Sequence, residues 1–150
     1  MADLPCCELP GDHPRTTQSF AGAIATLQLP SELTQQVKTF SRTAGVTLFM
    51  TLVTAFKILL YRYTGQKDIV IGTDIANRNQ HEVENLIGFF VNQLVLRTDL
   101  SGTPTFRDLL RRVQQTTLAA YANQDLPFRS WYRHSSQSES SIKLRSFKLN

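Results

Sequence analysis

The strongest constraint on the fold is the apolar stretch over residues 87–99, which carries an asparagine, Asn92, near its centre. Its second part, residues 91–98, is predicted to be a strand whose side chains alternate between two faces. One face would hold Val91, Gln93, Val95 and Arg97, and the other Asn92, Leu94, Leu96 and Thr98. An amide in so apolar a run must find a hydrogen-bond partner or lie beside a cavity. Asn92 is therefore the first candidate functional residue, the alternative being an asparagine bonded to neighbouring backbone.

Upstream of this stretch, the pattern predicts a strand followed by a helix. Apolar residues alternate over 21–29, which indicates a strand closed by Pro30. Ser31 is expected to cap a helix over residues 32–44, and Gly45 has the residue type that commonly follows a helix. The segment ahead of them, residues 1–20, is rich in proline and predicted to be an extended connector.

A second helix is expected to start after Thr47 and to reach Tyr63. Apolar residues occupy so many of its positions that it is predicted to be largely buried. Two helices joined by a short turn could be a DNA-reading helix-turn-helix. That alternative is disfavoured, because a recognition helix needs polar side chains that reach base edges and this one offers mainly Leu, Phe, Val and Thr.

Two more elements complete the predicted frame. Residues 68–76 form a β-branched run typical of a strand, and residues 82–86 suggest a helical turn. Thr105 and Asp108 resemble a capping box at the start of a helix that Asn123 ends. This order predicts an α/β fold, a two-layer sandwich of a mixed sheet with helices. Beyond residue 128, a Ser-rich basic stretch (129–150) is predicted to be a disordered tail.

The distribution of charge argues against nucleic-acid binding. Residues 1–128 hold 11 Lys+Arg and 11 Asp+Glu, so the whole net charge of +4 belongs to residues 129–150. A neutral body lacks the basic surface that phosphate contacts require. The most apolar run, residues 48–63, is interrupted by polar residues and too short to cross a bilayer, so no membrane partner is expected. The cytoplasm is the expected compartment.

No residues of this chain suggest a metal site or a catalytic base. Cys6 and Cys7 are adjacent, seldom a pairing arrangement, and lack further ligands nearby. The three histidines, His13, His81 and His134, stand apart, and none has an evident partner to orient it. The sequence therefore predicts no catalytic residue and no metal ligand.

Several ordered motifs resemble the C-terminal half of a condensation domain from a nonribosomal peptide synthetase. The match covers residues 8–128 and includes two of the family's core motifs, the fifth and the sixth. The similar segments are ELPGDHPR (8–15), GVTLFMTL (45–52), YTGQKDIVIGT (63–73), IANR (75–78), IGFFVN (87–92, continuing to Arg97) and NQDLPF (123–128).

The resemblance implies the second lobe of a chloramphenicol-acetyltransferase-like, CoA-dependent acyltransferase fold, here residues 21–128. In the family, two lobes enclose a tunnel where a carrier-bound acyl thioester is attacked by a carrier-bound amine, and an amide forms. No cofactor would bind directly, because phosphopantetheine arms of the carrier domains hold the substrates. The resemblance implies that the lobe interface or substrate tunnel includes Gly88, Phe89, Phe90 and Asn92, with Gln124 and Asp125 near it.

The chain also departs from the family pattern. The HHxxxDG motif lies in the family's N-terminal lobe, and no adjacent histidines occur here. A Ser-rich stretch stands where further helices and strands would follow, so the lobe is predicted to be truncated and inactive alone. The alternatives are a binding lobe that self-associates or complements a separate N-terminal lobe, and another thiol- or CoA-dependent acyltransferase of the same fold. For Gln124 and Asp125, the alternative is a purely structural turn before Pro127.

Overall fold

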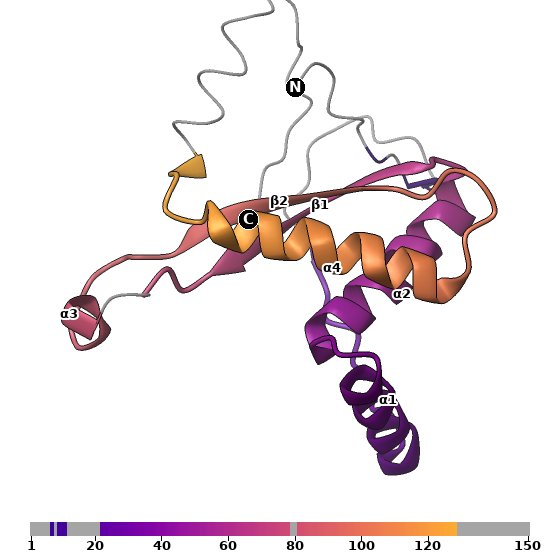
Figure 1. Ribbon diagram of the computed structural model, residues 1–150, viewed down its shortest axis with the longest axis horizontal. Coiled ribbons are helices and arrows are strands. Elements are labelled where there is room, and N and C mark those ends of the chain that lie inside the picture. The colour runs from indigo at the N-terminus through magenta and orange to yellow at the C-terminus, as the bar shows by residue number, and fades with distance from the viewer. Residues whose placement is uncertain (1–6, 8, 12–21, 79–80, 129–150) are drawn as a thin grey trace, which may run out of the picture.

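The computed structural model describes residues 7, 9–11, 22–78 and 81–128. Most of the predicted connector and the whole predicted tail lie outside these residues. Helices α2 and α4 lie against a two-stranded sheet, and α3 lies at the far end of the connection between the strands (Figure 1). The elements are α1 (Ser31–Thr43), α2 (Leu48–Thr64), β1 (Asp68–Ile75), α3 (His81–Glu84), β2 (Asn92–Asp99) and α4 (Phe106–Ala122).

Strand β2 pairs with β1 in antiparallel register, from Asp68 opposite Asp99 to Ile75 opposite Asn92. The predicted alternation along β2 is confirmed, because Leu94, Leu96 and Thr98 are buried on one face while Gln93, Val95 and Arg97 are half-buried on the other. The α/β class is confirmed as well. Over the described residues the sheet consists of these two antiparallel strands.

The strand predicted over residues 21–29 is wrong for its described part. Residues 22–30 have no regular structure, and the side chains of Ile24 and Leu27 are exposed. Alternation forms a strand only when a neighbouring strand supplies hydrogen bonds. In the part of the chain that the structure describes, neither β1 nor β2 pairs with this segment.

The helix boundaries follow the caps in two cases out of three. Thr47 caps α2 as predicted, since its Oγ1 accepts a hydrogen bond from the Met50 amide at 3.2 Å. Thr105 and Asp108 form the predicted capping box of α4. The predicted cap of α1 is wrong: Pro30 is the N-cap residue, without a side-chain hydrogen bond, and Ser31 is the first residue of the helix.

The predicted burial of α2 is wrong in its face. The side chains buried along this helix are Met50, Thr51, Thr54, Lys57 and Leu60. Four large apolar side chains of the same helix are about half exposed or more, and they define the α2 stripe: Leu52 (48%), Phe56 (49%), Leu59 (50%) and Tyr63 (67%).

Hydrogen bonds explain why the polar face of α2 is buried. The Thr54 hydroxyl donates to the Met50 carbonyl at 2.7 Å, and the Thr51 hydroxyl lies 2.8 Å from that of Ser41 on α1. Buried polar groups with partners cost little free energy. The apolar part of the core comprises two clusters, one around Leu60, Ile69, Leu100 and Leu109, the other around Met50, Leu110 and Val113.

Candidate functional site

Asn92 joins the first residue of β2 to the segment that follows α4. Its Nδ2 donates to the carbonyls of Gln124 at 2.7 Å and Leu126 at 2.9 Å. Its Oδ1 accepts from the Phe128 amide at 3.1 Å. The half-buried amide therefore has partners at three backbone positions in the segment 124–128. One side chain thus holds together two segments of the chain that are more than thirty residues apart.

The two other candidates in this segment contribute differently. Gln124 takes part through its backbone carbonyl, which accepts from Asn92. Asp125 is exposed, and the turn around it is closed by the Leu126 amide donating to the Asn123 carbonyl at 3.3 Å. The backbone of this segment is therefore positioned by the asparagine of β2 and by its own turn.

The remaining candidates lie on the connection between the strands, which we call the arm (residues 81–91). Ile87 and Phe89 are the most solvent-exposed apolar side chains of the arm, at 104% and 90%. Phe90 is half-buried instead. Gly88 separates the exposed pair, and a Cβ there would lie 3.0 Å from the Phe90 ring. The arm extends beyond the helices, and α3 forms its tip (Figure 1).

Arg78 is the residue that sequence reasoning missed in this region. Its guanidinium donates to four carbonyls of the arm: Val83, Glu84 at 3.3 Å, Leu86 at 2.8 Å and Gly88 at 3.3 Å. Its Cζ also lies 4.3 Å from the centre of the Phe90 ring, within the range of a cation–π contact. The only available signal was its place in the IANR motif, which names no partner.

Lys57 is a second polar residue that the sequence did not single out. It is 1% exposed, and its Nζ donates to the Leu96 carbonyl at 2.7 Å and to Thr98 Oγ1 at 2.6 Å. Burial lowers the pKa of its ammonium group from 10.5 to about 8, while the nearby Asp68 carboxylate acts in the opposite direction. Asp68 itself forms a bidentate pair with Arg97 across the sheet, with 2.6 Å between Oδ2 and Nη2.

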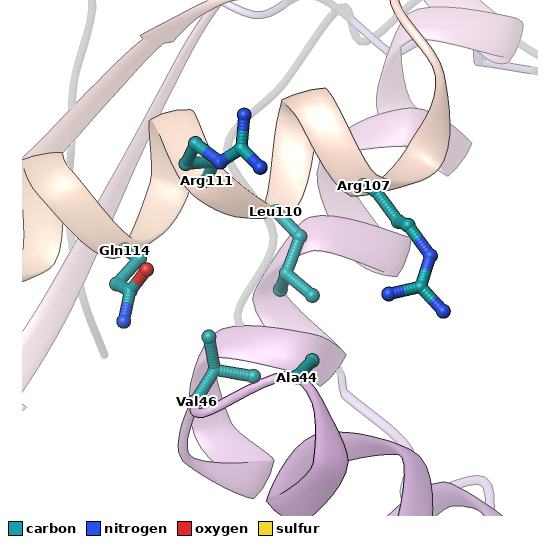
Figure 2. A pocket seen from close by; sticks show the side chains of 6 residues that line it. All are labelled: Ala44, Val46, Arg107, Leu110, Arg111 and Gln114. Carbon is teal, nitrogen blue, oxygen red and sulfur yellow. The ribbon is translucent and has the colours of Figure 1, made fainter.

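A shallow pocket lies between α4 and the turn that joins α1 to α2 (Figure 2). It has a volume of about 90 Å³ and is half open to solvent, with Ala44, Val46 and Leu110 as its apolar part. Arg107 and Arg111 line it as well, and both are exposed. Arg107 lies 5.6 Å from the Phe40 ring, so part of its role is packing. None of the candidate residues above lines this pocket.

Within the described ranges, no group of three or more His, Cys, Asp or Glu side chains could hold a metal ion. His81 is exposed, and its Nδ1 lies 3.2 Å from Glu84 Oε2 on the same helical turn. No single described helix is long and apolar enough to cross a bilayer, although the pair of α1 and α2, bent by 106°, satisfies the length and composition criteria.

Comparison with known proteins identifies the family. A family model described as "Condensation domain" matches residues 2–148. The chain belongs to the condensation-domain family. One relative, from the linear gramicidin synthase of Brevibacillus parabrevis, is 59% identical over 125 residues, which are 83% of this chain and 2% of that protein. We call this protein the gramicidin relative. Malpinin synthetase of Mortierella alpina is 54% identical over 122 residues, 81% of this chain and again 2% of the relative.

Solved structures agree on the fold. The SgcC5 protein of Streptomyces globisporus is similar with a TM-score of 0.66 and 39% identity, over 69% of this chain and 23% of that one. The first condensation domain of the CDA synthetase gives a TM-score of 0.68 at 19% identity, over 78% of this chain and 26% of that one, which supports the fold alone. The resemblance seen in the motifs is thus confirmed, and amide-bond formation is the reaction of the family.

Proposed function

We propose that this chain supplies part of the C-terminal lobe of an amide-forming condensation domain and needs histidines from outside its 150 residues to catalyse the reaction. The observation that carries the proposal is the set of hydrogen bonds from Asn92 to residues 124–128. They join the segments that resemble the fifth and sixth core motifs of the family. One side chain therefore builds a continuous wall out of both motifs.

In the proposed reaction, the acceptor amine attacks the carbonyl carbon of the donor thioester. The C–N bond forms, the C–S bond breaks, and the amine proton must be removed by a base. This sequence has no adjacent histidine pair, and His81 is an exposed residue of the arm. We assign to this chain the shaping of the reaction space by Gly88, Phe89, Phe90 and Asn92, and the base to the HHxxxDG motif of the other lobe. The residues of this chain would exclude water and position substrate.

Both substrates are proposed to arrive on phosphopantetheine arms of carrier domains, as the family resemblance implies. The partners of this chain would then be two carrier domains and an N-terminal condensation lobe. The specific donor and acceptor are left open. A cytoplasmic location and the absence of a directly bound cofactor stay predictions from the sequence.

A graft tests the proposal. Residues 22–128 would replace the corresponding segment of the condensation domain of the gramicidin relative, and product formation from carrier-loaded substrates would be followed by mass spectrometry. We expect the graft to form the amide, and the same graft with Asn92→Ala to lose most of the activity. A folded graft without turnover, when the parent domain is active, would contradict the proposal.

A second candidate function is favoured by the exposed α2 stripe. Four large apolar side chains on one helix, about half exposed or more, form a surface that favours association. We infer that the isolated chain could act as a non-catalytic lobe that self-associates or pairs with a separate N-terminal lobe. Size-exclusion chromatography with light scattering tests this candidate. A monomer at high concentration that also ignores an added N-terminal lobe would overturn it.

A further inference from the structure

The arm has very little hydrogen bonding of its own. The ladder between β1 and β2 ends where Ile75 pairs with Asn92, so the arm continues beyond the paired part of both strands. Within the described residues of the arm, one backbone–backbone bond is formed outside the α3 turn, from the Leu86 amide to the Val83 carbonyl at 3.3 Å. A segment of this kind is held in one conformation only if side chains replace the missing ladder.

Arg78 supplies that replacement. Asn77, the residue before it, has a φ of 51°, a left-handed conformation that asparagine tolerates better than most residues. This turn follows β1 directly and precedes the guanidinium that reaches the arm. The four acceptors belong to residues 83–88, and the Phe90 ring packs beneath the same group. Charge-assisted bonds of this type are stronger than neutral ones, and the planar guanidinium donates in several fixed directions at once.

The contacts of Arg78 determine which ring is covered and which is exposed. Phe90 is held under the guanidinium and is half-buried, whereas Phe89, its neighbour in sequence, points into solvent at 90% exposure. Ile87 is equally open. Gly88 lies between these two, and its carbonyl accepts from Arg78 at 3.3 Å. The arginine therefore fixes the backbone on both sides of the two exposed apolar side chains.

We propose that Arg78 is a positioning residue that holds the arm so that Phe89 is presented to the N-terminal lobe. This inference rests on the proposed function, because it takes the lobe contact of Phe89 from there. Arg78 itself touches neither substrate nor the partner lobe. It acts through the backbone of residues 83–88 and through Phe90.

The first experiment uses the complete 150-residue chain and does not depend on the proposed function. Chymotrypsin cleaves after Phe89 and Phe90 only when the arm opens, so its initial rate at these sites reports how firmly the arm is held. We expect Arg78→Ala to raise this rate roughly tenfold, as loss of one or two charge-assisted bonds predicts. Arg78→Lys, which keeps the charge but not the fork, should rescue it only in part. Arg111→Ala on α4 removes the same charge elsewhere and should leave the rate unchanged.

The second experiment separates positioning from general stability. The partner is the histidine lobe, which we define as the segment of the gramicidin relative that precedes the matched residues and includes the HHxxxDG motif. Its Kd for the chain would be measured for wild type, Arg78→Ala, Phe89→Ala and the double variant. We expect each single variant to weaken binding roughly tenfold, the loss typical of an aromatic anchor, and the double variant to bind no worse than Phe89→Ala.

Each outcome bears on the inference. Additive losses in the double variant, or a melting temperature lowered by Arg78→Ala as much as by a core substitution, would show that Arg78 acts generally and would overturn the positioning role. Unchanged chymotrypsin cleavage would overturn the contact of Arg78 with the arm. If the wild-type chain does not bind the histidine lobe, the proposed function fails and the presentation of Phe89 fails with it. The cleavage rates then show separately whether Arg78 holds the arm.

Discussion

The buried ammonium group of Lys57 makes the stability of this chain depend on pH in a direction that can be calculated. The pKa of Lys57 is about 8 in the folded chain and 10.5 when the chain is unfolded, because burial disfavours the charged form. Between these values the unfolded chain binds more protons, so the free energy of unfolding rises with pH. Below pH 8 both states are protonated, and above 10.5 neither is.

The size of the effect follows from the same two values. Between about pH 7 and about pH 10, the contribution of Lys57 to the free energy of unfolding rises by about 2.5 kcal/mol. We would replace Lys57 with methionine, which has a similar length and no charge, and measure urea unfolding at both pH values. Lys38, exposed on α1, provides the control substitution Lys38→Met.

Other lysines and tyrosines also titrate in this range, so the prediction concerns a difference between variants. Wild type and Lys38→Met should gain about 2.5 kcal/mol more than Lys57→Met between the lower and the higher pH. Parallel pH profiles for wild type and Lys57→Met would refute the reasoning. They would mean that the ammonium group has the same pKa in the folded and unfolded chain, and that its two hydrogen bonds offset the desolvation.

Three further predictions concern single residues. Asn92→Ala removes three hydrogen bonds to residues 124–128 and should lower the free energy of unfolding by about 1–3 kcal/mol in a urea titration, since water replaces part of the loss; an unchanged midpoint would count against the proposed wall. Thr105→Ala breaks the capping box of α4 and should cost about 1 kcal/mol in the same assay, with Thr103→Ala as the control. Phe56→Glu places a charge in the α2 stripe and should shift the chain towards monomer in light scattering at unchanged helicity; an unaltered mass distribution would contradict the second candidate function.

Local patterns in the sequence predicted the elements whose causes are themselves local. The alternation of β2 and the capping box of α4 depend on residues two or three positions apart, so both could be predicted from the chain alone. Asn92 could be marked because an amide among apolar residues needs a partner. Its partners could not be named, because they are backbone groups more than thirty residues away.

The errors came where tertiary contacts decide the outcome. Helix α2 has apolar residues around most of its circumference, so periodicity did not select a face. The face was selected by hydroxyl and ammonium groups that find partners inside, such as Thr51 with Ser41 and Lys57 with Thr98. The strand expected over residues 21–29 failed for the related reason that a strand depends on a neighbour. The role of Arg78 was invisible because its acceptors are carbonyls, which every residue has.

The central claim is that this chain forms one wall of a condensation site whose base comes from elsewhere. The most direct measurement is amide formation from two carrier-loaded substrates by the chain alone, by the histidine lobe alone, and by the two mixed. The account predicts no product above background from either part and measurable product from the mixture. Product formed by the isolated chain would contradict the claim, because these 150 residues would then contain the base themselves.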